Sequence, residues 1–534
     1  MTDSNKKASL KRPACLGIGL AIVALMGCGG PQETKTAAPD EAAAGMAQPG
    51  GATVEALQKM LPANAEVLSA TTAQTPDYVQ YVRVDGVVTV DDPGPWPVRF
   101  MLALPEKFNG RYFMISQGGT GGSVPDPDPG MLREGFAVAA MDRGTKPAFS
   151  TDPSVWSDPV QGLNLAHRAM HAAAVATQQL TRAYYGVSSI HRYTAGCSGG
   201  GVAGWNHMRA HGADDFEGVV IGDGSAFAPA NNVQWARMLQ YLLNHPEGWI
   251  PPDLMAAAEK AVIEKYDGAD GAADGIIQDA RLIDFDVNVL RDAGLSDAQI
   301  KAVQFANASW TYHLANSPIT VRGLPITRMS DWTNWYFGTK PPPWTDLDWP
   351  EAPRAYPGTK SFFEALPGKP DLKTVNLDDP EGQTFFIRPD GSSSGPFDFH
   401  KFRDGGGKVI AYFASDDPIG SFLQYGLPAL EGARALEDDP HNIGNWMRLF
   451  SIPGMLHCRG GAGPDDVPQQ TLNALIAWVE KGEAPDSILA HRKDGRSFLL
   501  CPEPMRATFK GGGENADALD VNDAANWACA SGEQ

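Results

Sequence analysis

A serine lies between glycines in a segment that must turn sharply, and few folds can accommodate such a segment. Residues 196–200 read Gly-Cys-Ser-Gly-Gly, after the strand-like run 192–195 and before residues 202–210, which can form a helix. Glycines two before and two after a serine let a strand turn into a helix without Cβ clashes, so Ser198 projects from the turn towards the helix N-terminus. The pattern predicts a nucleophile elbow. A chance Gly-rich loop is the alternative, because the chain contains 58 glycines.

The amino terminus has the features of an export signal. Residues 1–27 combine a basic region with an apolar run, Leu16 to Met26, that is too short for a stable membrane span. The run ends in Leu-Met-Gly-Cys, which resembles a bacterial lipoprotein box, so we expect Cys28 to be lipidated. An ordinary signal peptide with an incidental cysteine is the alternative. Residues 28–55 are predicted to form a disordered tether, and the protein is expected in the outer membrane or periplasm, or secreted.

The net charge and the length of the chain limit the classes of function that it can have. The formal net charge of -20 argues against a nucleic-acid partner, which needs a basic face. Membrane contact is expected only through the lipid on Cys28. The 534 residues suffice for one large core with an inserted subdomain, or for two or three domains.

Strand-like and helical runs alternate over residues 56–224, which indicates a doubly wound, mostly parallel sheet. A buried strand at 111–115 runs into glycines at 118–122, where bare backbone N–H groups can build an oxyanion hole at Gly119. A plain flexible turn is the alternative. The other runs are strands within 82–104, at 136–141 and at 216–221, and a helix at 163–185.

The alternation stops over residues 225–397, which we interpret as an inserted lid domain. Seven of the 13 tryptophans fall here, either as a small core or as the lining of an aromatic pocket. The insertion contains Asp267, Asp270 and Asp274, spaced by glycines. Carboxylates this close repel one another unless a cation lies between them, and hard oxygen ligands suit calcium. A solvated acidic loop is the alternative.

The strand pattern resumes in residues 398–534. A strand at 409–413 precedes Asp416-Asp417-Pro418, a strand at 447–452 precedes His457-Cys458, and a closing helix is expected at 472–481. A serine, then an acid, then a histidine, each after a strand, is the order found in an α/β-hydrolase. The fold predicted is therefore an α/β-hydrolase sheet with a large inserted lid, and His457 is its expected base.

Cys15 is removed with the signal and Cys28 is expected to carry the lipid, so four of the six cysteines remain to pair, and they allow three pairings. Cys197 is next to Ser198 and Cys458 is next to His457, which suggests a disulfide that ties the nucleophile to the base. Cys501 and Cys529 would then pair with each other. Free buried thiols are the alternative, but disulfides persist in exported proteins.

Three segments together resemble the tannase and feruloyl esterase family. They are Cys-Ser-x-Gly-Gly, a later Asp-Pro, and Pro-Gly-Met-x-His-Cys-x-Gly-Gly-x-Gly-Pro-Asp, within a likeness that runs from about residue 111 to 529. The resemblance implies Ser198 as nucleophile, His457 as base, and Asp417 as the acid that orients it. Asp417 is preferred over Asp416 because it directly precedes the proline.

The resemblance also implies a structural calcium ion and an activity. Its ligands would be the carboxylates of the three lid aspartates and the backbone carbonyls of Ala272 and Ile276. The chain departs from the family at Tyr266, where a cysteine is common, and at residues 142–145, which read Asp-Arg-Gly-Thr. The implied activity is a serine carboxylic-ester hydrolase for small esters of aromatic acids, hydroxycinnamic, gallic or similar.

In that reaction the backbone N–H groups of Gly199 and Gly119 would bind the oxyanion. Two alternatives remain open at this point. One is an esterase of the same fold for terephthalate half-esters or other oligoesters, and the other is a lipid-anchored binding protein for aromatic ligands.

Overall fold

The computed structural model describes residues 52–146, 155, 158–314, 318–386, 395–511 and 519–531. The expected signal segment, Cys28 and tether residues 28–51 lie outside these ranges. Helix α1 (Val54–Gln58) is capped by the Thr53 side chain, so the predicted tether extends slightly too far at its end. Within the described ranges, no helix has both the length and the apolar character needed to cross a bilayer.

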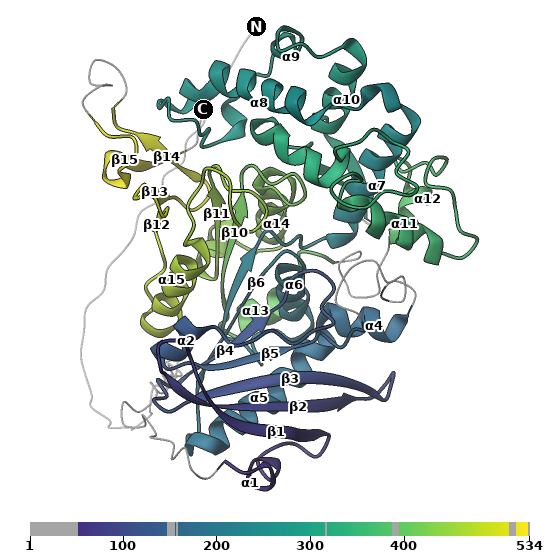
Figure 1. Ribbon diagram of the computed structural model, residues 1–534. Coiled ribbons are helices and arrows are strands. Elements are labelled where there is room, and N and C mark those ends of the chain that lie inside the picture. The colour runs from purple at the N-terminus through teal and green to yellow at the C-terminus, as the bar shows by residue number, and fades with distance from the viewer. Residues whose placement is uncertain are drawn as a thin grey trace, which may run out of the picture. The chain divides into compact units, whose positions relative to one another are not determined.

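A nine-stranded sheet organises the chain (Figure 1). Strands β5, β4, β6, β7, β10 and β11 pair in parallel, and β1, β2 and β3 add an antiparallel edge beside β5. The mostly parallel sheet predicted from the sequence is therefore confirmed. The strands are β1 (Ala65–Gln74), β2 (Gln80–Val90), β3 (Trp96–Pro105), β4 (Arg111–Ser116), β5 (Ala137–Met141), β6 (His191–Cys197), β7 (Gly218–Gly222), β10 (Lys408–Ala414) and β11 (Met447–Ile452).

Strands β5 and β7 contain no polar side chain and are buried throughout, because both faces of the sheet are covered. In β4, Tyr112 and Met114 belong to the core on one face, while Phe113 between them belongs to the core on the other. Helices α5 and α6 pack on the first face, and α2 and α15 on the second. Besides α1, the α-helices outside the insertion in the described ranges are α2 (Pro129–Glu134), α4 (Pro159–Leu163), α5 (Ala169–Tyr185), α6 (Gly199–His211), α13 (His400–Asp404), α14 (Leu427–Arg434) and α15 (Val467–Lys481).

The segment between β7 and β10 contributes no strand to the nine-stranded sheet among its described residues. Its helices gather together in Figure 1. Three of its tryptophans, Trp310, Trp332 and Trp344, are buried in the same core that lies on the first face of the sheet. The described part of the insertion therefore does not extend the nine-stranded sheet. Its elements are α7 (Ala228–Asn244), α8 (Pro252–Tyr266), α9 (Asn288–Asp292), α10 (Asp297–Asn307), α11 (Ala355–Ala365), α12 (Pro380–Gln383), β8 (Trp310–His313) and β9 (Pro318–Val321).

Two small antiparallel sheets follow α15, and the sequence pattern did not predict them. Strand β12 pairs with β13 in one sheet, and β14 pairs with β15 in the other. The Cys501–Cys529 disulfide, with Cα atoms 5.6 Å apart, joins the residue after β13 to β15 and confirms that predicted pairing. The strands are β12 (Ile488–His491), β13 (Ser497–Leu500), β14 (Met505–Phe509) and β15 (Trp527–Ser531).

Candidate active site

Ser198 occupies a strained turn between β6 and α6. Its φ of 60° is in the left-handed region, which a residue with a Cβ rarely adopts. The flanking glycines permit the turn: a Cβ at Gly196 would lie 2.7 Å from the Ser116 carbonyl oxygen, and one at Gly200 would lie 2.1 Å from it. The Ser198 amide donates to the Gly222 carbonyl at 2.9 Å, which ties the turn to β7. The side chain of Ser198 thus stands at the carboxyl edge of the sheet, on a partly exposed residue.

His457 and Asp417 meet at the same edge of the sheet. His457 Nδ1 lies 2.6 Å from Asp417 Oδ2, so the ring N–H donates to the carboxylate and Nε2 is left to accept a proton. The Asp417 side chain is fully buried, and its Oδ1 accepts from the Ile419 amide at 2.8 Å. Burial opposes the charge of His457, but Asp417, Asp223 and nearby carboxylates outweigh it and raise the pKa of the imidazole.

A disulfide joins the residues beside the serine and the histidine. Cys197 and Cys458 are bonded, with Cα atoms 5.9 Å apart, as the sequence predicted. Because Cys197 precedes Ser198 and Cys458 follows His457, the bond fixes the separation of the β6 turn and the loop after β11. The elements that carry these two residues come from halves of the chain separated by the whole insertion.

Asp223 is a site residue that the sequence reasoning missed. It follows β7 directly, and its buried carboxylate accepts from the Ala414 amide and the Cys458 amide, both at 2.7 Å. Its ligand oxygen, that of Asp417 and the ring nitrogen of His457 all lie within 4.8 Å of one another. Burial, followed by repulsion from Asp417, raises the pKa of Asp223. The sequence did contain a signal for Asp223: an aspartate that directly follows a buried central strand lies at the carboxyl edge of the sheet, where the other site residues lie.

The glycine turn after β4 lies directly against the start of α6. A Cβ at Gly199 would be 2.2 Å from the Gly119 carbonyl oxygen, so only glycine allows this approach. The Gly199 amide is in the first turn of α6, where N–H groups lack partners within the helix. Arg143 donates to the carbonyls of Gly119 and Gln117, at 3.0 and 3.3 Å, and so fixes the turn. The sequence reasoning noted the position of Arg143 only as a departure from the family.

Asp416 faces away from the histidine and holds the insertion. Its Oδ1 accepts from the Thr327 hydroxyl at 2.6 Å, and its Oδ2 pairs with Arg328 at 3.2 Å. Arg328 also pairs with Glu259 and donates to the Gly275 carbonyl at 3.0 Å. The two adjacent aspartates therefore have different partners: Asp417 binds the imidazole of His457, and Asp416 binds residues of the insertion.

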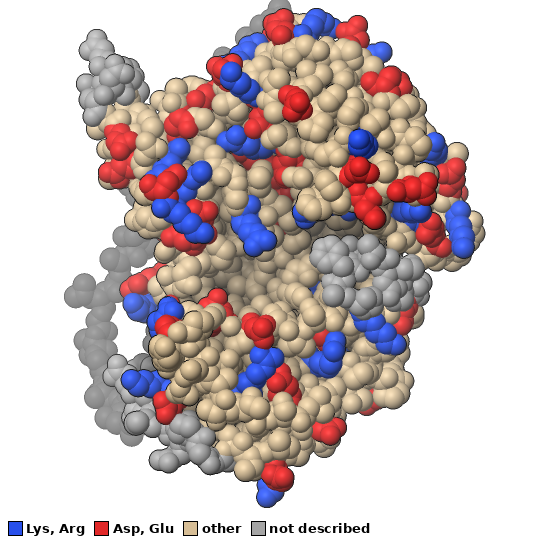
Figure 2. All heavy atoms as spheres, viewed as in Figure 1, with Lys and Arg blue, Asp and Glu red and all other residues tan. Residues whose placement is uncertain are grey.

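Aromatic residues of the insertion reach the histidine. The ring of Trp335 meets that of His457 edge to face, with centroids 5.6 Å apart, and Trp235 lies 6.1 Å from Trp335. The exposed guanidinium of Arg354 stacks over Trp335 and Trp349, at 5.8 and 4.3 Å from the ring centroids. Figure 2 shows a hollow between the insertion and the sheet, and few charged residues line its visible walls.

The loop predicted to bind calcium offers hard oxygen donors in a turn that packs near the site. Ile276 packs against Gly454, three residues before His457: a Cβ on Gly454 would lie 3.2 Å from the Ile276 Cδ1. Burial and the neighbouring aspartates raise the pKa of Asp270 to about 6, although the Gln278 and Ala272 amides donate to it. Asp267 accepts from the Gly275 amide. These groups suit a hard cation.

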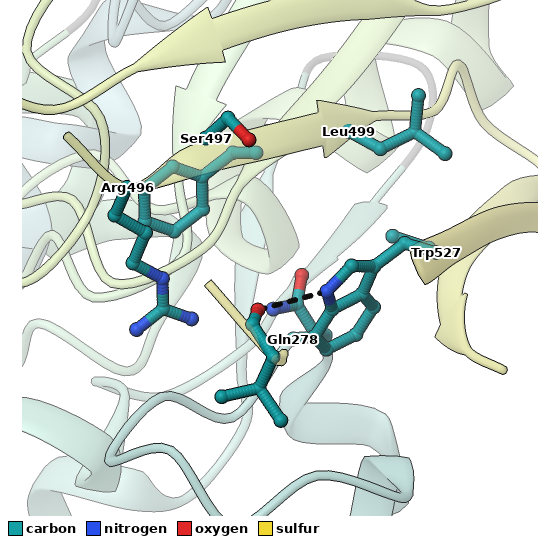
Figure 3. A pocket seen from close by; sticks show the side chains of 8 residues that line it. Gln278, Arg496, Ser497, Leu499 and Trp527 are labelled. Carbon is teal, nitrogen blue, oxygen red and sulfur yellow. Dashed lines mark hydrogen bonds between the residues drawn. The ribbon is translucent and has the colours of Figure 1, made fainter. Parts of the chain in front are cut away.

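The carboxylates of this loop, however, do not converge on a single point. The carboxylate oxygens of its three aspartates do not form a cluster within 4.8 Å, and Arg496 is paired with Asp274. Figure 3 shows Arg496, Gln278 and Trp527 around a small pocket between this region and the carboxyl-terminal strands. None of the three catalytic candidates lines that pocket. Three carboxylates and one guanidinium leave two negative charges, which match a divalent cation.

Comparisons with known sequences find relatives among esterases. The family model described as "Tannase and feruloyl esterase" matches residues 82–328 and 390–524. A mono(2-hydroxyethyl) terephthalate hydrolase of Piscinibacter sakaiensis is 26% identical over 541 residues, which cover 88% of this chain and 87% of that protein. A probable feruloyl esterase B-1 of Aspergillus oryzae is 27% identical over 446 residues, with 78% of this chain and 79% of that protein covered.

Solved structures share the fold. Feruloyl esterase B from Aspergillus oryzae superimposes with a TM-score of 0.74 at 23% identity, over 89% of this chain and all of that one. A tannin acyl hydrolase from Aspergillus niger gives a TM-score of 0.67 at 19% identity, over 90% of this chain and 94% of that one. At such identities, these likenesses establish the α/β-hydrolase fold alone.

Proposed function

Because the chain belongs to the tannase and feruloyl esterase family, we propose that it hydrolyses esters of aromatic acids through Ser198, His457 and Asp417. It is a carboxylic-ester hydrolase, as are its named relatives. The observation that carries the assignment of residues is the bond from His457 Nδ1 to the buried Asp417 carboxylate, at the edge of the sheet that also presents Ser198. A disulfide holds the two elements together.

Each residue has one role in the reaction. Ser198 Oγ attacks the ester carbonyl while His457 Nε2 takes its proton, and the same proton then goes to the leaving alcohol. Asp417 keeps His457 in the tautomer that has a free Nε2 and stabilises the imidazolium that forms. The amides of Gly199 and Gly119 donate to the oxyanion. Water then attacks the acyl-enzyme by the same route in reverse and releases the acid.

The aromatic character of the acid follows from the insertion. The Trp335 and His457 rings meet edge to face, so an indole lies beside the base, where the acyl group of an ester would bind. Aromatic pairs prefer stacked or edge-to-face contacts, which add about 0.5–1.5 kcal/mol to area burial. Trp235, on α7, extends this surface. Esters of hydroxycinnamic, gallic or similar acids fit such a surface.

A second candidate substrate class is favoured by Arg354. Its exposed guanidinium stacks over Trp335 and Trp349 beside the site, where it can bind a free carboxylate on the far side of an aromatic acyl group. A terephthalate half-ester has that carboxylate, and a relative named as a mono(2-hydroxyethyl) terephthalate hydrolase is 26% identical.

Calcium binding and export complete the proposal. The carboxylates of the three lid aspartates and the carbonyls of Ala272 and Ile276 would hold calcium, which supplies charge neutralisation to the loop. Calcium–oxygen distances of about 2.3–2.6 Å require the loop to contract slightly. Two disulfides support export to an oxidising compartment, with attachment through a lipid on Cys28.

A panel of purified substrates tests the proposal. Feruloyl, galloyl and terephthaloyl esters are incubated with wild-type protein and with Ser198→Ala, and acid release is followed by chromatography. We expect turnover of at least one aromatic ester by wild type only. The variant Arg354→Gln separates the two substrate classes, since it should raise KM for a terephthalate half-ester and leave that for methyl ferulate nearly unchanged. Binding of aromatic esters without hydrolysis would instead identify a binding protein.

A further inference from the structure

Arg143 comes shortly after β5 at the carboxyl edge of the sheet, in the segment 142–145 where the chain departs from its family. It is only 2% exposed, although its side chain carries a charge. Its φ of 60° lies in the left-handed region, which is unfavourable for a residue with a Cβ. A buried guanidinium needs hydrogen-bond partners to offset the loss of water, so those partners indicate what the residue does.

The guanidinium of Arg143 holds the glycine turn after β4, residues 117–122. Its Nη1 donates to the Gly119 carbonyl at 3.0 Å and to the Gln117 carbonyl at 3.3 Å. Its Nη2 donates to the Leu165 carbonyl at 2.5 Å, within the π-helical turn that precedes α5. The side chain therefore ties the glycine turn to the start of a helix that packs on the sheet.

The two carbonyls held by Arg143 lie on either side of one peptide unit. The Gln117 carbonyl belongs to the peptide that joins Gln117 to Gly118, and the Gly119 carbonyl belongs to the peptide that follows Gly119. The unit between them carries the Gly119 N–H, the proposed oxyanion donor. Glycine adopts positive and negative φ with similar ease, so this unit would turn easily if its neighbours were free. Because peptide units are planar, fixing both neighbours limits that rotation.

Other residues of the segment 142–145 hold the rest of the turn. The Gly122 amide donates to the Asp142 carbonyl at 2.8 Å, and the Thr145 hydroxyl donates to the Thr120 carbonyl at 2.6 Å. The segment is thus a brace along the whole glycine turn, and Arg143 contributes the contacts at residues 117 and 119.

The first residues of the turn lie against the nucleophile. A Cβ on Gly118 would lie 3.9 Å from the Ser198 Cβ, and one on Gly199 would lie 2.8 Å from the Gly119 nitrogen. The amides of Gly119 and Gly199 are therefore close together beside Ser198, where the oxyanion forms in the proposed reaction.

We propose that Arg143 is a positioning residue of the esterase: it aims the Gly119 N–H at the oxyanion without touching the substrate. This role rests on the proposed function. An arginine suits it because the planar fork donates in several directions at once, to both carbonyls of the turn and to Leu165, whereas a lysine ammonium is a compact point charge. Loss of one oxyanion donor lowers kcat about 100- to 1000-fold, and Arg143 acts through the backbone, so we expect a smaller fall of about 10- to 100-fold in kcat/KM.

The test compares Arg143→Met and Arg143→Lys with a matched control, Arg99→Met, in the full exported chain. Arg99 also donates to the glycine turn, but at its far end, to the Gly122 carbonyl at 3.0 Å, and it pairs with Asp142 at 2.8 Å. Each protein is assayed with para-nitrophenyl benzoate and with the corresponding thionoester. The temperature is one at which melting curves show every protein to be folded.

The thionoester separates positioning from general stability. Its tetrahedral intermediate carries sulfur, which is larger than oxygen and a weaker hydrogen-bond acceptor, so it gains less from a correctly aimed N–H. Wild type should prefer the oxygen ester. Arg143→Met should lose about 10- to 100-fold in kcat/KM for the oxygen ester and much less for the thionoester, so that this preference collapses. Arg143→Lys should fall between the two, and Arg99→Met should keep the wild-type values.

The outcomes distinguish this role from the proposed function itself. A wild type inactive on both esters would overturn the proposed function and the role of Arg143 with it. An active wild type, together with a folded Arg143→Met that keeps its kcat/KM for the oxygen ester, would overturn the role alone. Equal losses on both esters would do the same, because a merely structural residue lowers both rates together. Should Arg143→Met fail to fold, Arg143→Lys decides by the same criteria.

Discussion

Replacement of both Cys197 and Cys458 by alanine tests whether their bond controls catalytic geometry as well as stability. The bond spans a sequence separation of 261, and the chain entropy that it removes from the unfolded state corresponds to about 5.6 kcal/mol. The Cys501–Cys529 bond spans 28 residues, which gives about 3.6 kcal/mol. The free energies of unfolding of the two double variants should therefore differ by about 2 kcal/mol.

The two variants should differ more in catalysis than in stability. The Cys197–Cys458 bond joins neighbours of Ser198 and His457, and a shift of catalytic groups by about 1 Å can lower the rate about 100-fold. The other bond touches neither residue. We expect kcat to fall roughly 10- to 100-fold in the first variant only, when both are folded.

Urea unfolding and steady-state hydrolysis of one aromatic ester, at a temperature well below both transitions, measure the two effects. Circular dichroism confirms that each variant is folded during the rate measurement. An unchanged kcat in the first variant, or an equal kcat loss in both, would refute the link between this bond and the geometry of the site.

Three further predictions concern charged groups. The pH profile of kcat/KM should rise through a pKa above the ordinary histidine value, because His457 must lose a proton that the nearby carboxylates stabilise. Asp223→Asn removes one of these negative charges and should move the rising limb to lower pH. An unmoved limb would exclude an effect of Asp223 on the pKa of His457. Asp417→Asn should lower kcat about 10⁴-fold through the wrong tautomer, while Asp416→Asn should mainly lower the melting temperature; the reverse pattern contradicts the assignment. Calcium at a hundredfold excess over Kd should stabilise by about 2.7 kcal/mol, so chelation should lower the melting temperature until calcium, but not zinc, is restored, and Asp270→Asn should abolish the response.

The parallel sheet could be predicted because its strands are buried on both faces. Residues 409–413 are a short apolar run and residues 447–452 are mostly apolar, and both formed strands, β10 and β11. The glycines at 196 and 200 were equally informative, since a Cβ at either clashes with Ser116. By contrast, β12 to β15 are four or five residues long and pair only locally, so their patterns are too short to distinguish from loops.

The site residues that were missed depend on contacts between distant segments. Asp223 accepts hydrogen bonds from the Cys458 and Ala414 amides because β7 lies beside β10 in the sheet. The periodicity of a local stretch of sequence does not reveal the order of strands in a sheet. Arg143 acts on the backbone of a turn, and Arg496 reaches Asp274 from 222 residues away. The disulfide between Cys197 and Cys458 was predictable because these cysteines adjoin Ser198 and His457, which must lie close together for proton transfer.

Covalent labelling with a fluorophosphonate, located by mass spectrometry of a proteolytic digest, tests the proposed nucleophile most directly. Such a reagent reacts with a serine only when a base activates it and an oxyanion site receives the phosphonyl oxygen. We expect one label per chain, on the peptide that contains Ser198, no label on Ser198→Ala, and labelling slowed at least 1000-fold in His457→Ala. Absence of label from the folded wild-type protein, or label on another residue, would contradict the mechanism.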